Sequence, residues 1–191
     1  MGKLITSTWI TLDGFICGPN GEMDFVGKFF DEEMGNYEKT LVDGASTLLL
    51  GKTTYDSFAG SWPNVPDNPN VSEDEKDYAR VLNKLNKVVY SKTLKTVEWN
   101  NSVLYSDINK DEIIKLKSSS EKNIVIYGSA SIIQQLTTLS LIDEYQLLVH
   151  PIFLGSGKPL FKDEVTLSLL KTDKFKSGVA FNSYILAINK P

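Results

Sequence analysis

Glycine and hydroxyl residues follow the end of an apolar run in this 191-residue chain, and their types suit the binding of an anion. The run Ser46–Leu50 stops at Gly51, and Lys52, Thr53 and Thr54 follow at once. Glycine lets a ligand approach the backbone, while the free amides and the dipole of a helix start favour negative charge. The pattern therefore predicts a phosphate site, although an ordinary strand-to-helix connection capped by threonine has the same sequence.

The same arrangement occurs a second time. A second apolar run, Ile124–Tyr127, precedes a stretch of small residues, and the serine that ends this stretch has capping-box spacing with Gln134. Two helix starts at the carboxyl ends of strands suit a ligand with two or more phosphates. The stretch consists of Gly128, Ser129, Ala130 and Ser131.

A third run, Lys87–Tyr90, ends in Ser91 and Lys92, which place a hydroxyl and a cation where a further phosphate could be held. A solvated turn is the alternative interpretation of these two residues. None of the three stretches is a named nucleotide motif. A Walker A loop needs a second glycine five residues before Gly51, where Ser46 stands, and no Gly-x-Gly-x-x-Gly fingerprint is present.

Composition excludes several classes of function. The chain has one cysteine, Cys17, and one histidine, His150, so it can form neither an internal disulfide nor a zinc cluster, and we expect no metal site. A serine or cysteine hydrolase would depend on His150 alone, for which we favour a structural role at a strand end. The net charge is −4 and Arg80 is the only arginine, which does not support nucleic-acid binding.

No apolar run approaches the roughly 18 residues that a membrane span needs, so we expect no membrane association and a cytoplasmic location. Length predicts a single domain over residues 1–191. Strand-like and helix-like segments alternate, which predicts an α/β/α sandwich of three layers around a mixed, mostly parallel sheet of about eight strands. A C-terminal antiparallel hairpin, joined at Ser177-Gly178, would complete the sheet.

One segment has a helical period: Val26, Phe29, Phe30, Met34, Tyr37 and Leu41 recur at three and four residues, with charged residues, Glu38 among them, between. It predicts one amphipathic helix. The other predicted helices are Thr53–Phe58, Glu73–Leu85, Asp111–Lys117 and Ser131–Leu139. The predicted strands are Leu4–Leu12, Ser46–Leu50, Lys87–Tyr90, Ile124–Tyr127, Ile142–Val149, Val165–Lys176 and Val179–Asn189.

In order and spacing, several stretches resemble the dihydrofolate reductase-like family, and most of all its branch related to the reductase domain of riboflavin biosynthesis. The resemblance covers nearly the whole chain. Its stretches are Thr11–Gly21, Leu50–Tyr55, Val89–Leu94, Ile126–Ser131, Leu141–Tyr145, Pro151–Gly157 and Pro159–Phe161. The zinc deaminase domain of the full bacterial riboflavin enzyme has no counterpart here.

The resemblance implies an NADPH-dependent reductase. Gly51, Lys52, Thr53 and Thr54 would hold the pyrophosphate and the adenosine end, and the second helix start, Gly128 to Ser131, would lie under the pyrophosphate. Lys52, Ser91 and Lys92 would lie near the ribose phosphate, and Ile16 would border the nicotinamide. The sequence departs from the family pattern where Lys52 and Lys92 replace common arginines and Ser129 replaces the second glycine of a Gly-Gly pair. Lysine keeps the charge, so we expect NADPH to be preferred to NADH.

The implied reaction is hydride transfer to a small, flat heterocycle of pterin-like or pyrimidine-like chemistry. Substrate contacts would come from Trp9, Thr11 and Asp13, and from Asp31 or Glu32, one of which would correspond to the carboxylate of folate-reducing relatives. The alternatives are a core role for Trp9, a turn role for Asp13 and solvated charges at Asp31 and Glu32. The other function that fits is an NADP(H)-binding module without turnover, a sensor or sequestering protein. A homodimer would cover the strand edge of the tail hairpin.

Overall fold

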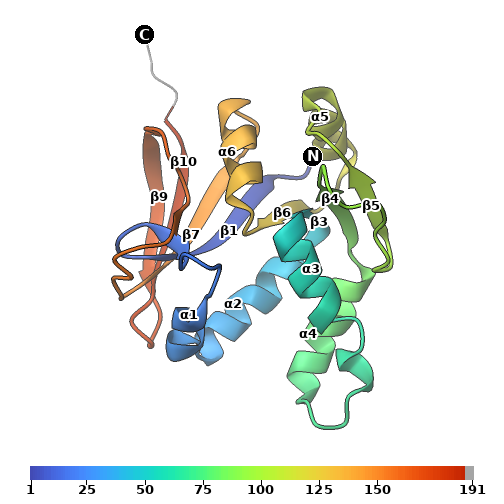
Figure 1. Ribbon diagram of the computed structural model, residues 1–191, viewed down its shortest axis with the longest axis horizontal. Coiled ribbons are helices and arrows are strands. Elements are labelled where there is room, and N and C mark those ends of the chain that lie inside the picture. Colours follow the sequence, from blue (N-terminus) through green and yellow to red (C-terminus); the bar gives the residue numbers. More distant parts are fainter. Residues whose placement is uncertain (188–191) are drawn as a thin grey trace.

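Eight strands form one sheet in the order β5-β4-β3-β6-β1-β7-β10-β9, and two short strands, β2 and β8, pair separately (Figure 1). The computed structural model describes residues 1–187. The strands are β1 (Leu4–Thr11), β2 (Phe15–Cys17), β3 (Ala45–Gly51), β4 (Asn86–Tyr90), β5 (Ser102–Tyr105), β6 (Asn123–Tyr127), β7 (Glu144–His150), β8 (Lys158–Pro159), β9 (Leu167–Lys174) and β10 (Ala180–Leu186). The helices are α1 (Asp24–Phe29), α2 (Glu32–Asp43), α3 (Lys52–Ser61), α4 (Glu73–Lys84), α5 (Lys110–Ser119) and α6 (Ala130–Thr138), with a 3-10 turn at Val65–Asp67.

The sheet is mixed, as predicted. Strands β5, β4, β3, β6, β1 and β7 are parallel to one another, whereas β10 is antiparallel to both β7 and β9. The predicted C-terminal hairpin is therefore confirmed as β9–β10. Residues 188 and 189 of its predicted second strand lie outside the described residues.

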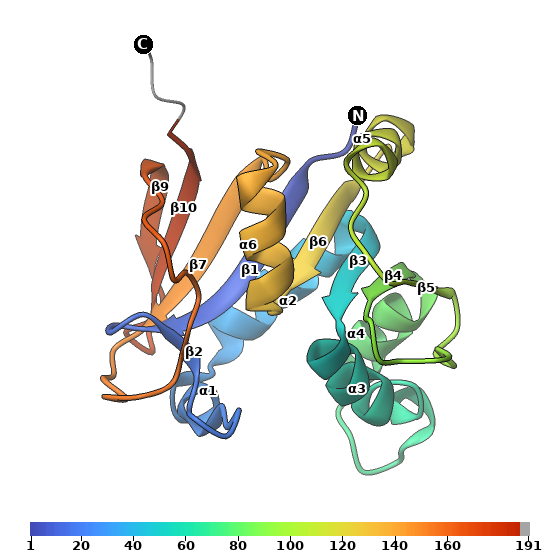
Figure 2. The ribbon, with the colours of Figure 1, turned by 45° about the horizontal axis from the view of Figure 1, so that its top comes forward.

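Helices cover both faces of the sheet, which confirms the three layers (Figure 2). On one face, Ile113 of α5 and Ile133 and Leu136 of α6 join the even-numbered apolar residues of β6 in a core. On the other face, α2, α3 and α4 pack on the alternate residues of β3 and β6, among them Leu48 and Val125. Side chains on a strand alternate between faces, so each central strand supplies both cores.

The prediction of one continuous helix through Val26 and Leu41 is wrong. The structure has two helices, because the backbone at Phe30 is extended (ψ 123°) and Asp31 restarts the chain as the N-cap of α2. The carboxylate of Asp31 accepts the amide of Met34 at 2.9 Å. The apolar period continues across this break, so periodicity alone did not reveal it.

Strands β2, β5 and β8 were not predicted, and each has only two to four residues. Within residues 1–187, no helix combines the length and the apolar character that crossing a bilayer requires.

Candidate functional site

The sheet has an opening between β1 and β6 at their carboxyl ends, where β6 stops at Tyr127 and β1 continues to Thr11. β1 pairs with β6 only as far as Ser7 and Tyr127, whereas it continues beside β7 to Thr11 and His150. The connection after β1 runs through α1 and α2 on one face, and the connection after β6 runs through α6 on the other. Adjacent strands whose connections leave on opposite faces create a crevice at their carboxyl ends, the usual ligand site of such sheets.

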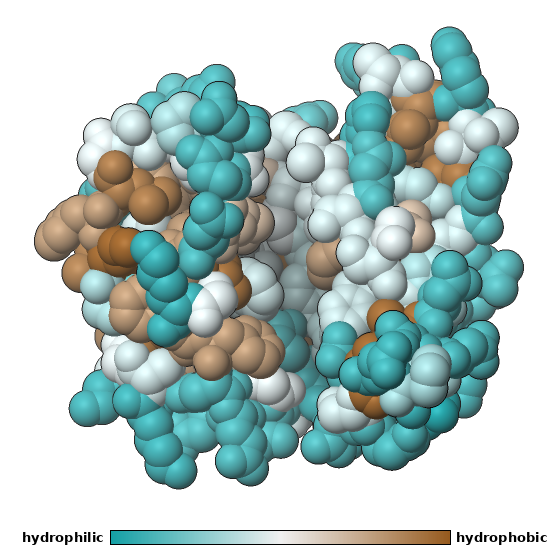
Figure 3. Space-filling model, turned by 60° about the horizontal axis from the view of Figure 1, so that its bottom comes forward, coloured by the Kyte–Doolittle hydropathy of each residue, from teal (hydrophilic) through white to brown (hydrophobic). Residues whose placement is uncertain are grey.

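A groove is visible on this side of the molecule. Figure 3, in which the lower side of Figure 1 comes forward, shows it between the part that holds α1 and the β9–β10 hairpin and the part that holds α3 and α4. Helix α3, which starts after Gly51, thus belongs to one wall of this groove.

The two predicted helix starts touch each other. The Gly51 amide donates to Ser129 Oγ at 2.8 Å, and the Thr54 hydroxyl lies 3.0 Å from the same oxygen. A Cβ at position 51 would lie 2.7 Å from Ser129 Oγ, so a side chain there would displace the serine. Glycine is therefore required at position 51 by close approach, and two of the predicted residues, Gly51 and Thr54, contact the hydroxyl of a third, Ser129.

Two consecutive left-handed residues turn the chain from β6 into α6. Gly128 has φ 53° and Ser129 has φ 57°, a conformation that is uncommon for a residue with a side chain. Ser129 is the N-cap of α6, and its side chain makes no cap bond because it faces Gly51. The predicted capping box is wrong: α6 begins at Ala130, and the Gln134 amide donates instead to the Leu160 carbonyl at 2.6 Å.

The predicted cations lie at neighbouring strand ends. Gly51 and Tyr90 are register partners, so Lys52 and Ser91 follow adjacent positions of the sheet. Lys52 pairs with Asp56 one turn along α3. Both side chains are about half exposed, and exposed ion pairs contribute little, so this lysine can exchange its partner for a phosphate.

The strand end after β4 also has a lysine in an exposed ion pair. Lys92 pairs with Asp107 at 2.9 Å, and both side chains are largely exposed. The Ser91 hydroxyl accepts the amides of Thr93 and Leu94 at 3.1 and 3.0 Å, which makes it a turn-forming group. Of the remaining predicted residues, Thr53 and Ser131 are exposed and Ala130 is half-buried.

On the proposed substrate side, Thr11 and Asp13 bind each other. The Thr11 hydroxyl donates to the Asp13 carboxylate at 2.5 Å, and the other carboxylate oxygen accepts the Gly155 amide at 2.8 Å. The hydrogen bond from Thr11, with those from the Gly155 loop, holds the pKa of Asp13 below its usual value. Both residues thus tie the end of β1 to the glycine loop, and Ile16 follows them, half-buried, in β2.

Asp31 faces the tail hairpin. Besides capping α2, its carboxylate accepts the Ser177 amide at 2.8 Å, and these backbone hydrogen bonds, that from Met34 first, lower its pKa. Glu32 is exposed. The structure therefore gives Asp31 a structural task, and it leaves Glu32 on the surface of the first turn of α2.

A buried carboxylate that the sequence pattern had placed on the polar face lies under the opening. Glu38 of α2 is 5% exposed, and it accepts Trp9 Nε1–H at 3.1 Å and the Tyr127 hydroxyl at 2.6 Å. Burial raises its pKa to about 7 in spite of these two donors. The missed signal was spacing: Glu38 lies four residues after Met34, on the stripe that α2 buries.

His150 lies at the end of β7 with its ring against Phe25 and Phe29, at centroid distances of 5.0 and 6.0 Å. Its Nδ1 lies 2.9 Å from the Leu148 carbonyl oxygen, and burial lowers its pKa. The ring is fully buried.

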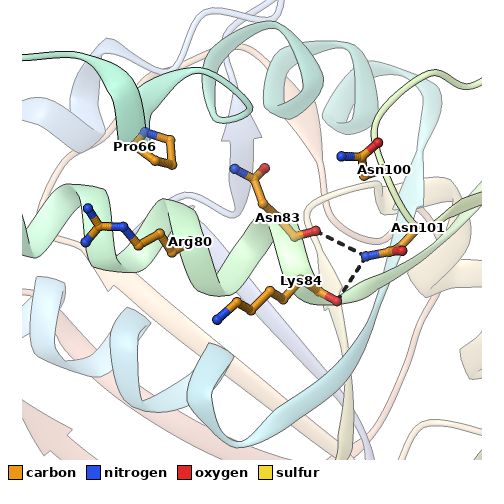
Figure 4. Close-up of a pocket in the computed structure, with 6 residues that line it drawn as sticks. All are labelled: Pro66, Arg80, Asn83, Lys84, Asn100 and Asn101. Atoms are coloured by element: carbon orange, nitrogen blue, oxygen red, sulfur yellow. Dashed lines mark hydrogen bonds between the residues drawn. The ribbon is translucent and has the colours of Figure 1, made fainter.

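A shallow hollow also lies at the opposite end of the sheet (Figure 4), where Asn101 donates to the carbonyls of Asn83 and Lys84 at 3.3 and 3.2 Å. These residues precede β4 and β5, so the hollow is separate from the opening at the carboxyl ends. Pro66, Arg80, Asn83, Lys84, Asn100 and Asn101 line it.

Solved structures share this arrangement of strands and helices. A putative riboflavin biosynthesis protein from Shewanella sp. PV-4 superimposes with a TM-score of 0.72 at 20% identity, covering 98% of this chain and 100% of the other. Dihydrofolate reductase from Enterococcus faecalis, solved with NADP(H), gives a TM-score of 0.61 at 16% identity and coverage of 98% of both chains. The protein therefore has a dihydrofolate reductase-like fold.

Sequence comparison identifies the family. The family model described as RibD C-terminal domain matches residues 2–181. The uncharacterized protein YyaP of Bacillus subtilis (strain 168) is 34% identical over 180 residues, which cover 93% of this chain and 91% of that protein. The chain belongs to the RibD C-terminal domain family.

Proposed function

We propose that the protein is an NADPH-dependent reductase whose substrate is a small, flat heterocycle of pterin-like or pyrimidine-like chemistry. The observation that carries the proposal is the contact of Gly51 and Thr54 with Ser129, which joins two helix starts beside the opening between β1 and β6. Two sets of helix-start amides at one strand edge suit a pyrophosphate. The fold and the family support the reductase assignment.

The two helix starts, Gly51–Thr54 and Gly128–Ser131, together form a cradle, and the residues of this cradle fit a dinucleotide. Gly128 adopts a positive φ that brings backbone close to the edge of the sheet, and small residues open α6. Lys52 and Lys92 supply two exposed charges at the adjoining strand ends. When bound, NADPH supplies the hydride, so the protein needs no nucleophile of its own.

The chain's own residues bind and position. The helix-start amides and Thr54 would hold the phosphates, and Lys52 and Lys92 would release their carboxylate partners to pair with the ribose phosphate. Trp9 projects toward α2 from the part of β1 that lies beyond its pairing with β6, where it can offer its ring to a flat substrate. Thr11 and Asp13 would shape the substrate side indirectly by fixing the Gly155 loop.

Fluorescence titration with NADPH and NADH, followed by loss of the NADPH absorbance with dihydropterins, aminopyrimidinones and flavins, tests the proposal. We expect NADPH to bind more tightly and at least one heterocycle to be reduced. Binding without turnover of any compound would favour the non-catalytic NADP(H)-binding module. Absence of binding would contradict both functions.

Removal of a lysine charge tests cofactor selection. In Lys52→Ala and Lys92→Ala we expect the Kd for NADPH to rise about tenfold, because a charge-assisted contact contributes about 1.5 kcal/mol or more. The Kd for NADH should rise less than the Kd for NADPH, because NADH lacks the ribose phosphate. Lys95→Ala, an exposed lysine outside the predicted set, is the control. Equal weakening of both cofactors would show that these lysines do not recognise the ribose phosphate.

A further inference from the structure

The carboxylate of Glu38 connects two strands at the place where their backbone pairing stops. Trp9 of β1 lies two residues beyond the last β6 partner of that strand, and Tyr127 is the last residue of β6. Both side chains reach the same face of the sheet and donate to different oxygens of Glu38. The Glu38 side chain therefore links β1 and β6 just beyond their last backbone pair.

The group is sealed from solvent and surrounded by neutral donors. Burial is the main influence on Glu38 and favours its neutral form, while Tyr127 and Trp9 favour the charged form, which together leaves a pKa of about 7. The titratable groups that face it are tyrosines: Tyr127 from β6, Tyr78 from α4 and Tyr37 from its own helix. Burial raises the pKa of each tyrosine, so all three stay neutral.

The two protonation states make different hydrogen bonds. The carboxylate accepts two charge-assisted bonds, from the indole of Trp9 and from the hydroxyl of Tyr127. With a proton on Oε2, the group donates to the Tyr127 oxygen instead, and the bond from Trp9 becomes a weaker neutral one. One proton thus changes how firmly β1 is held to β6.

Trp9 connects this change to the rim of the site. Its ring packs edge-on against Phe30, with centroids 6.3 Å apart, and Phe30 is 49% exposed between α1 and α2. A change in the hydrogen bond between Trp9 and Glu38 therefore affects the packing of the Trp9 ring against Phe30, at the surface of the proposed substrate side.

We propose that Glu38 is a positioning residue of the reductase site. Its hydrogen bonds with Trp9 and Tyr127 form a clasp across the opening between β1 and β6. The protonation of Glu38 changes this clasp and, through it, ligand binding at the opening. This inference rests on the proposed function only for the identity of the ligand. The clasp itself is a property of the free protein.

The first test follows the indole N–H signals of Trp9, Trp62 and Trp99 in ¹⁵N-labelled protein as the pH is varied. We expect the Trp9 signal, assigned by its loss in Trp9→Phe, to shift with a midpoint near 7. Trp99 reports a different group: the Lys87 ammonium, whose pKa burial lowers to about 8, lies 4.1 Å from its ring centroid, so any shift of the Trp99 signal should have its midpoint near 8. A Trp9 signal that does not titrate would overturn the clasp.

Variants assign the titration to Glu38. Glu38→Gln keeps an acceptor for Trp9 and a donor for Tyr127, so it should fold and abolish the Trp9 titration. Tyr127→Phe removes one bond that stabilises the charge, so the midpoint should move to higher pH. An unchanged titration in Glu38→Gln would overturn the assignment, and Tyr127→Phe provides an independent check if the glutamine variant does not fold.

The second test measures the Kd for NADPH at pH 6 and pH 8 in the wild type and in Glu38→Gln. The cofactor's own phosphate titrates equally in both, so the difference between the proteins reports Glu38. Between pH 6 and pH 8, we expect the Kd of the wild type for NADPH to change by several-fold more than the Kd of Glu38→Gln. Binding with the same pH dependence in both would overturn the role of the clasp alone, whereas absence of binding in both would overturn the proposed function and with it this role.

Discussion

A single hydroxyl, that of Ser129, decides the geometry of the cradle. It accepts the Gly51 amide and lies 3.0 Å from the Thr54 hydroxyl, so one oxygen holds the starts of α3 and α6 together. The backbone of Ser129 is left-handed, which costs a residue with a Cβ about 1 kcal/mol. The serine therefore combines a strained backbone with a hydrogen bond that offsets it.

Two substitutions separate these contributions. Ser129→Ala loses the bond and keeps the strain, whereas Ser129→Gly loses the bond and relieves the strain. We expect the glycine variant to be more stable than the alanine variant by about 1 kcal/mol in urea unfolding. Both variants also lose the contact that joins the starts of α3 and α6. Equal stability of the two variants would argue against backbone strain at this position.

At the residue scale, the sequence alone predicted the positions of those site residues that directly follow the end of a parallel strand. Gly51 and Ser129 were placed together by the rule that parallel strands end at one edge, and the structure has them in contact. Glu38 was missed because a glutamate next to Lys39 looks solvated. Its spacing from Met34 was the one local signal, and its hydrogen-bond partners on β1 and β6, far away in sequence, could not be derived from it.

At the scale of elements, the start of α2 is a docking point for the tail hairpin. Asp31 caps the helix and accepts the Ser177 amide, and Glu33 accepts the Lys176 amide at 2.7 Å and pairs with the Lys176 ammonium at 3.3 Å. The break between α1 and α2 makes Asp31 an N-cap, and in this position its carboxylate can also bind the turn of the tail hairpin.

Loss of this cap should be measurable. We expect Asp31→Ala to lower the free energy of unfolding by about 1–2 kcal/mol, since it removes an N-cap and a second backbone bond. Asp31→Asn should lose less than Asp31→Ala, because its Oδ1 still caps α2 whereas its Nδ2 cannot accept the Ser177 amide. Glu32→Ala, on the exposed next residue, is the control. Should Asp31→Ala match that control in urea unfolding, the cap would contribute nothing.

The missed strands have a physical reason in their length. β2, β5 and β8 span three, four and two residues, too few for a period of two to stand out. The longer central strands were all predicted because they are buried runs of branched residues. Their order in the sheet could not be derived from such runs, since it depends on which strands pair.

At the scale of the whole molecule, a buried carboxylate makes stability depend on pH. The folded protein keeps a proton on Glu38 up to about pH 7, whereas the unfolded chain releases it near 4.5. Between these values the folded state binds more protons, so the contribution of Glu38 to stability falls as the pH rises. His150 acts in the opposite direction, because burial lowers its pKa and acid then favours the unfolded chain.

Comparison with Glu38→Gln isolates the Glu38 contribution, since both proteins contain His150. We expect the glutamine variant to gain stability relative to the wild type as the pH rises from 5 to 8, by up to about 3 kcal/mol. Urea unfolding at each pH measures the difference. A difference that stays constant over this range would mean that Glu38 does not retain its proton on folding.

The open edge of β9 supports a homodimer as the assembled form. Within the described residues β9 pairs only with β10, and this hairpin exposes Leu169, Leu170 and Ile185 by 56%, 55% and 38%. A sheet edge with exposed apolar side chains is a surface that another copy can cover. We therefore expect light scattering to give twice the chain mass of 21.3 kDa.

The double variant Leu169→Lys, Leu170→Lys should return the protein to the mass of one chain, because each lysine would place a charge in the covered surface. Ile114→Lys is the matched control: it changes an apolar residue of similar exposure, 46%, on α5, which lies across the molecule from β9 (Figure 1). A wild type that scatters as a single chain at every concentration would refute the dimer. Loss of the dimer in the control as well would place the contact elsewhere than on β9.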